Sequence, residues 1–229
     1  MNEYELKIYN LLLENQDEKY GDFNSKIINI DRNKIIGVRM PIIRKISKEI
    51  LKDKDFVDGF LEIKKHEYYE LDLMHMLLIV GLKDYNRVIS ELDSFLPHVN
   101  TWAITDSASP KVFLKHKDEL VKKMDDWISS AHPFKIRYGI ILLMKLYLED
   151  DFKIEYMNKV RDIKSDDYYV NMARAWYIAE AVAKQRDYAI HLLESKSLDK
   201  FTQNKAISKA RDSYKVSKED KDYLKNLRK

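Results

Sequence analysis

The sequence predicts an all-α protein in which pairs of helices stack on one another, and three observations support this fold class. Only 5 of the 229 residues are Gly and 4 are Pro, whereas an all-β chain needs many turns and normally uses more of both. Hydrophobic residues make up 45% of the chain, which suffices for a core. From residue 40 onward, apolar helical segments come in pairs whose first helices start roughly 28–34 residues apart, the spacing of helical-hairpin repeats.

Helical periodicity begins at residues 3–14, where Leu6, Tyr9, Leu12 and Leu13 share one side. Residues 15–37 are polar and weakly periodic, so we expect them to be mostly irregular, with one turn of helix at most. The next helix opens at Pro41, whose missing N–H has no partner to lose in a first turn. The predicted helices from there cover residues 40–53, 55–65, 68–83, 85–98, 101–115, 118–131, 133–149, 154–163, 167–185, 186–195, 200–214 and 218–229.

A helix pair cannot cover its own apolar face, so each pair should stack on the next. The whole chain, residues 1–229, is therefore predicted to form a single repeat domain, a curved solenoid with a long concave surface. An irregular bundle with the same number of helices is the alternative. Because neither arrangement needs a second subunit to complete its core, we expect a monomer.

Several classes of protein are excluded by composition. The absence of Cys rules out disulfides and thiolate metal sites. The first ten residues carry acids and no apolar stretch, which is unlike a signal peptide. No apolar run reaches the roughly 18 residues that a membrane span needs, so we expect no membrane association and a cytoplasmic location. The net charge of +3 slightly favours an anionic partner.

Motifs for cofactor chemistry are not found in the sequence. The six His residues show no metal-ligand spacing, so we predict no metal site. The sequence contains neither a Gly-rich phosphate loop nor a nucleophile elbow of the G-x-S-x-G type. We therefore expect no cofactor.

Two of the three Trp residues stand beside charged residues. Trp102 and Asp106 are four positions apart and share one helix face, where a carboxylate without a partner would be costly to bury. Arg174 and Ala175 precede Trp176, and Arg137 lies in the first turn of its helix, where the helix dipole disfavours a cation. Each residue alone is more often structural: a Trp in a helical protein usually lies in the core, as we assign Trp127, and an Asp is usually solvated or salt-bridged.

As a set, these residues resemble the DNA alkylation-repair glycosylases of the AlkD type, which are built from HEAT-like repeats. The resemblance covers residues 36 to 216. The segments that carry it are IIGVRMPIIRKISKEI, TWAITDSASPKVFLKHKDEL, FKIRYGIILLMKLYL, YYVNMARAWYIAEAVAK and NKAISKARDSYKVS. The resemblance implies a HEAT-like solenoid whose concave groove faces DNA, and excision of positively charged N3- and N7-alkylated purines without a metal or cofactor.

The resemblance also implies roles for individual residues. Asp106 corresponds to the catalytic carboxylate, Trp102 and Trp176 to aromatics that pack against the deoxyribose and backbone of the lesion, and Arg137 to an Arg that contacts DNA. A carboxylate would stabilise the oxocarbenium character of the sugar and orient water, and aromatic faces favour cations. A basic residue taken alone more often belongs to a solvated surface. The further basic residues expected to contact phosphates are Arg39, Arg44, Lys45, Lys111, Arg174, Lys205, Lys209 and Arg211.

The N-terminal region departs from the glycosylases, in which additional helices help to hold DNA. Residues 15–37 look too irregular to form such a helix. The residues YGDFNSKII and IIGVR within and after this segment resemble a sibling subgroup that lacks it, which implies weakened or redirected recognition of damaged DNA. Three functions follow: an alkylpurine glycosylase acting on duplex DNA, a non-catalytic DNA-binding module, and a scaffold whose concave face binds a protein.

Overall fold

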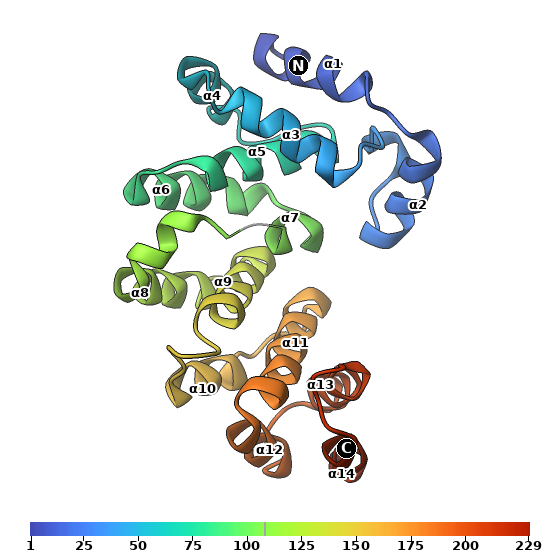
Figure 1. Cartoon of the computed structure of the whole chain (residues 1–229), viewed down its shortest axis with the longest axis vertical. Coiled ribbons are helices and arrows are strands. Elements are labelled where there is room, and N and C mark those ends of the chain that lie inside the picture. Colours follow the sequence, from blue (N-terminus) through green and yellow to red (C-terminus); the bar gives the residue numbers. More distant parts are fainter. Residues whose placement is uncertain (108) are drawn as a thin grey trace. The chain divides into compact units, whose positions relative to one another are not determined.

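The computed structural model describes residues 1–107 and 109–229, and these residues form helices and connecting segments only (Figure 1). The described part of the chain contains fourteen α-helices, four short 3-10 helices and no strand, which confirms the predicted all-α class. Ala108, inside the predicted helical segment 101–115, lies outside the described residues. Among the described helices, none combines the length and apolar character needed to cross a membrane.

The chain divides into two compact units, Met1–Lys117 and Asp118–Lys229, and each is described by itself. Neighbouring helices pack in pairs, as in HEAT-like repeats. The helices of the first unit are α1 (Glu3–Leu13), α2 (Glu18–Ile28), η1 (Arg32–Lys34), α3 (Met40–Ile50), α4 (Lys54–Leu61), α5 (Tyr69–Gly81), α6 (Tyr85–Phe95), η2 (Leu96–His98), α7 (Trp102–Asp106) and η3 (Lys111–Lys115). Those that follow are α8 (Lys117–Ile128), α9 (Pro133–Leu146), α10 (Ile154–Asp162), α11 (Tyr168–Lys184), α12 (Arg186–Glu194), α13 (Lys200–Asp212), α14 (Lys218–Leu224) and η4 (Lys225–Leu227).

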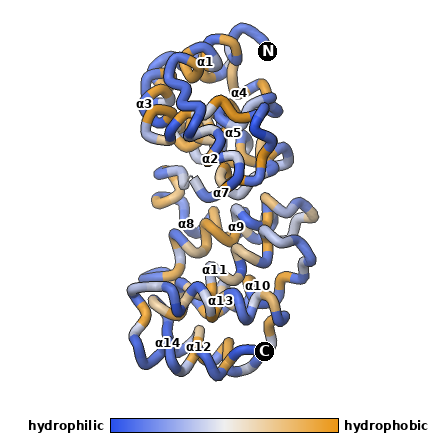
Figure 2. The backbone as a smooth tube through the Cα atoms, turned by 90° about the vertical axis from the view of Figure 1, so that its right-hand side faces the viewer, coloured by the Kyte–Doolittle hydropathy of each residue, from blue (hydrophilic) through white to orange (hydrophobic). Residues whose placement is uncertain are grey.

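Helix α5 is the centre of the first unit, because it contacts α1, α3, α4, α6 and α7. Ten of its thirteen residues are buried, and the backbone trace is strongly hydrophobic along it (Figure 2). A helix that is hydrophobic on all sides must be surrounded by others. Helix α5 therefore fixes the positions of the shorter helices around it, including α7.

Helix α11 has the same place in the second unit, where it contacts α9, α10, α12 and α13. It is the longest helix in the described chain, with 17 residues. Small residues such as Ala173, Ala175 and Ala181 are completely buried along it, which lets neighbouring helices approach closely. The prediction that Trp127 belongs to the core is confirmed, since only 1% of it is exposed.

The prediction that residues 15–37 are irregular is wrong, because they contain the eleven-residue helix α2. Asp17 caps its first turn by accepting a hydrogen bond from the backbone N–H of Tyr20 (2.9 Å), and Asn29 ends it in the left-handed conformation (φ 54°). The buried face hides the helix from a search for apolar periodicity, because it is made of Gly21, Asn24, Ser25 and Ile28. Membership of the subgroup that lacks a DNA-binding helix, which is expected from the residues of this segment as well, stays a prediction.

The first helix is placed correctly by the sequence, but its buried face is not. Ile8 and Leu12 are fully buried, whereas Leu6 is 48% and Leu13 41% exposed. Tyr9 lies beside the ring of Tyr68, with centroids 5.1 Å apart. The helix is therefore turned so that Ile8, rather than Leu6, faces α4 and α5.

A buried carboxylate fastens the segment between α2 and α3. Glu70, which is fully buried near the start of α5, accepts hydrogen bonds from the backbone N–H groups of Ile36 (2.9 Å), Gly37 (2.8 Å) and Val38 (3.2 Å). Gly37 has φ 95°, a conformation that L residues with side chains rarely adopt. Burial raises the pKa of Glu70 although the three N–H groups lower it.

Candidate nucleic-acid interface

Helix α7 carries Trp102 and Asp106 on one partly exposed face. Thr101 caps the helix, with its hydroxyl 3.4 Å from the backbone N–H of Ala103. Ile104 and Thr105 point inward and are at most 1% exposed, whereas Trp102 and Asp106 are half-buried. Since residues four apart in a helix are neighbours, the aromatic ring and the carboxylate border the same patch of surface, as the spacing predicts.

Thr105 contacts the carboxylate of Asp106. Its hydroxyl oxygen lies 3.0 Å from Asp106 Oδ1 and 3.0 Å from the carbonyl oxygen of Trp102. Because Thr105 is completely buried, its hydroxyl cannot rotate freely into solvent. The hydroxyl can donate its one proton to either acceptor, so it limits the orientations open to the Asp106 side chain, which is the kind of support that a catalytic carboxylate needs.

The predicted phosphate contact Arg39 lies at the start of α3 and is tied to α2. Its Nη2 lies 2.9 Å from Asp17 Oδ2, and its guanidinium carbon lies 4.7 Å from the centroid of the Tyr20 ring. The backbone N–H of Tyr20 and the Arg39 guanidinium both lower the pKa of Asp17. With 59% of its side chain exposed, Arg39 retains a surface that could meet an anion.

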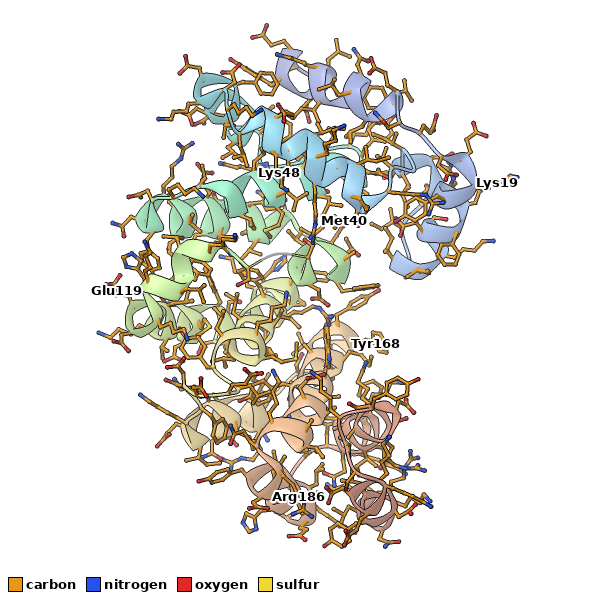
Figure 3. The ribbon with its side chains drawn as sticks, in the orientation of Figure 1. Lys19, Met40, Lys48, Glu119, Tyr168 and Arg186 are labelled. Atoms are coloured by element: carbon orange, nitrogen blue, oxygen red, sulfur yellow. The ribbon has the colours of Figure 1, made fainter. Side chains whose placement is uncertain are left out.

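Other predicted phosphate contacts of the first unit are exposed. Arg44 and Lys45 lie on the solvent side of α3, on the same helix as Lys48 (Figure 3). Lys111 is exposed at the start of η3. Exposure alone does not distinguish a phosphate contact from a solvated lysine, so these three residues stay predictions.

In the second unit, Trp176 and Lys209 lie together. The Lys209 Nζ is 5.8 Å from the centroid of the Trp176 ring, within the range of a cation–π contact. The two residues line a cavity of about 400 Å³ with Glu180, Tyr214 and Lys215. The Trp176 ring is half-buried, so one part of it packs on the protein and another part faces this cavity.

Arg174, also predicted to bind phosphate, is instead buried in a network of hydrogen bonds. Its Nε and Nη2 donate to the carbonyl oxygens of Val160 (3.1 Å) and Arg161 (2.9 Å), and its Nη1 lies 2.9 Å from Asp199 Oδ2. Only 4% of the side chain is exposed. The guanidinium thus joins α10 and α11 to the residue that caps α13, and this environment favours a structural role over contact with DNA.

Arg137 is similarly enclosed. It is 5% exposed, and its Nη1 donates to the carbonyl oxygen of Tyr169 in the first turn of α11 (2.8 Å). Lys205, one turn before Lys209 on α13, is half-buried, and Arg211 lies in the last turn of the same helix. The direct contacts of Arg137 and Lys205 with DNA stay predictions, as do those of Arg211.

Trp102, Asp106 and Arg39 thus belong to one unit, and Arg137, Trp176 and Lys209 to the other. The sequence missed the exposed aromatic residues Tyr168 and Phe201, which are 55% and 41% exposed with ring centroids 5.8 Å apart. Figure 3 labels Tyr168 at the start of α11. Their signal in the sequence is an aromatic residue at the first or second position of a helix, which periodicity assigns to neither face.

Comparison with known proteins gives one result for the chain. A family model described as "DNA alkylation repair enzyme" matches residues 8–210, which include α2 and most of α13. No curated protein matches the sequence.

Proposed function

The chain belongs to the family of DNA alkylation repair enzymes, and from this premise we propose that it is a DNA glycosylase that excises N3- and N7-alkylated purines from duplex DNA. The observation that carries the proposal is the pairing of Trp102 and Asp106 on the open face of α7, with Asp106 oriented by the buried Thr105. Trp176 and Lys209 would contribute an aromatic and cationic surface in the second unit.

Excision of an alkylated purine requires few catalytic groups. An alkylated purine carries a positive charge, so it departs as a neutral base when the bond between its nitrogen and C1′ of the sugar breaks. The sugar then develops oxocarbenium character. The Asp106 carboxylate would stabilise this cation and accept the proton of the water that attacks C1′. The face of Trp102, on the same helix as Asp106, would favour the cationic sugar by about 0.5–2 kcal/mol.

Two of the predicted DNA contacts would also position other residues. Arg137, whose direct contact with DNA stays part of the proposal, would hold the first turn of α11. Arg174 would hold the beginning of α13. These two helices carry Trp176 and Lys209. Arg39, Arg44 and Lys205 would contact phosphates directly, because they retain exposed surface. Such contacts position a duplex without reading its sequence.

The test is release of 7-methylguanine and 3-methyladenine from alkylated duplex DNA by the wild-type protein, Asp106→Asn and Asp55→Asn. Asp55, exposed in the first turn of α4, serves as the matched control. We expect Asp106→Asn to slow release by about 10²–10⁴-fold, the range for a positioned acid–base group, and Asp55→Asn to retain wild-type rates. A wild-type protein that releases neither base would refute the proposal.

The alternative of a non-catalytic DNA-binding module was based on the absence of a helix in residues 15–37. Because α2 occupies that segment, no observation now favours this function or a protein-binding scaffold over a repair enzyme. If the protein binds duplex DNA in a way that depends on salt but not on Asp106, and releases no base, a non-catalytic DNA-binding function would be favoured instead.

A further inference from the structure

The second unit contains a cationic cavity outside the Trp176 surface. Its volume is about 580 Å³, and it opens on α13, beside residues 225–229. We define the α13 cradle as the residues that line it, which are Lys200, Phe201, Asn204, Lys205, Ser208 and Arg228. Three of the six are cations and none is acidic.

The three cations of the α13 cradle have no carboxylate partner in the part of the chain that the structure describes. Elsewhere in the second unit, by contrast, Arg186 is paired with Asp220 and Lys184 with Glu149. Lys200, Lys205 and Arg228 line the same cavity, so their positive charges repel one another. An anion in the cavity would remove that repulsion.

Arg228 is held in place by the backbone on both sides of it. The side chain of Asn204 donates to the carbonyl oxygen of Lys229 (2.9 Å) and accepts from its N–H (3.0 Å). Gln203, completely buried, donates to the carbonyl oxygen of Leu227 (3.0 Å). These bonds attach residues 227–229 to α13 beside α14 (Figure 1). The backbone from which the Arg228 side chain extends is thus fixed before any ligand binds.

Phe201 separates the α13 cradle from a second cavity of about 470 Å³. That cavity is lined by Asp166 and Asp199 as well as by Lys164 and the buried Arg174, so its charges are balanced. The contrast favours the α13 cradle as the anion site. The exposed rings of Phe201 and Tyr168 add an apolar surface at its border, which suits a deoxyribose.

We propose that the α13 cradle binds adjacent phosphates of the duplex DNA backbone, with Phe201 against the intervening sugar. The proposal rests on the proposed function and extends it, since it assigns Lys200 and Arg228 to DNA binding. Arg228 lies beyond the residues 8–210 that match the family model. Because the contacts are to phosphate, they would serve all sequences equally.

The experiment measures binding of an undamaged, fluorescently labelled duplex at several salt concentrations. The variants are Lys200→Gln, Arg228→Gln and the triple variant that adds Lys205→Gln. Lys225→Gln is the matched control, because Lys225 is an exposed cation near Arg228 that is already paired with Asp222 (2.6 Å). Urea unfolding of each variant verifies that the fold is retained.

The slope of log K against log salt should become shallower by about 0.9 for each single substitution and by roughly 2.7 for the triple variant. The Lys225→Gln slope should match the wild type. A folded triple variant with the wild-type slope would overturn the α13 cradle while leaving the proposed function intact. A wild-type protein that binds no duplex would overturn both, and base release would be absent as well.

Discussion

The two units both arrange their helices around a central helix, but the central helices bury side chains of opposite charge. Each has one central helix, α5 or α11, that contacts most of the others, and each central helix buries one charged side chain. In α5 this is the anion Glu70, which accepts from three backbone N–H groups. In α11 it is the cation Arg174, which donates to two backbone carbonyl groups and pairs with Asp199.

The comparison shows how a helical-repeat protein holds its connecting segments. Backbone groups outside helices have no partner of their own and must find one when they are buried. The backbone N–H groups of residues 36–38 are donors without a backbone partner, so a carboxylate can satisfy them. The backbone carbonyl groups at the end of α10 are acceptors without such a partner, so a guanidinium can satisfy them. The sign of the buried charge therefore follows from which end of the peptide unit the segment presents, and not from a ligand.

The largest effect should come from removing the anion. Glu70→Ala leaves three buried N–H groups without an acceptor, at about 1–3 kcal/mol each, so we expect the free energy of unfolding to fall by about 3–9 kcal/mol. Urea unfolding measures this, with the exposed Glu67→Ala as the control. A loss below about 1 kcal/mol would show that the segment is held by other contacts.

Removal of the cation should have a somewhat smaller effect, because its partner Asp199 is half-exposed and can be solvated. We expect Arg174→Met to lower the free energy of unfolding by about 2–4 kcal/mol. Duplex binding by the folded variant should keep its salt slope. If stability is unchanged and the slope becomes shallower by about 1, Arg174 is a phosphate contact and the comparison between the units fails.

Gly37→Ala separates backbone strain from the loss of hydrogen bonds in the first unit. A Cβ at this position would lie 2.6 Å from the carbonyl oxygen of Asp17, and φ is 95°. We expect a loss of about 1–3 kcal/mol, with the N–H groups still directed at Glu70. Thermal or urea unfolding beside Gly59→Ala measures the difference, because the nearest atoms to a Cβ at Gly59 belong to the side chain of Tyr4, which can move, and φ is not positive there. Equal losses in the two variants would argue against strain at Gly37.

The smallest effect concerns pH and should be confined to the first unit. His66 contacts Glu5 (2.8 Å) and His75 (3.0 Å), with Lys64 and His98 nearby. Burial lowers the pKa of both His66 and His75. The unfolded chain takes up protons near pH 6.5, while the folded one stays neutral to lower pH. Stability is therefore full above about pH 6.5 and falls below it, by about 1.4 kcal/mol per pH unit for each histidine.

Hydrogen exchange read separately over residues 1–117 and 118–229 can locate this response, between pH 7.5 and 5.5. We expect faster exchange at low pH in the first unit, after correction for the intrinsic rate. His98→Gln is the control, since His98 is exposed and its removal should leave the response in place. An equal response in both units would contradict the assignment to the buried histidines.

The sequence predicts helices well where their buried faces are apolar and poorly where they are not. The helices from α3 to α14 follow apolar periodicity, whereas α2 buries Gly21, Asn24 and Ser25 and escapes it. The shared face of Trp102 and Asp106 follows from their spacing alone. The burial of Arg174 does not, because its acceptors come from α10 and from the residue before α13. The placement of Arg228 could not be predicted either, because it depends on hydrogen bonds from Asn204, 24 positions earlier, to the backbone of Lys229.

The attachment of Gly37 to Glu70 also has a consequence for evolution. The two positions are separated by more than thirty residues of sequence, yet neither retains its purpose without the other: the carboxylate is buried to receive the N–H groups of residues 36–38, and the turn at Gly37 presents them. A substitution at one position should be selected against unless the other position has changed as well. In an alignment of relatives, glycine at the first and glutamate at the second should be inherited together or lost together.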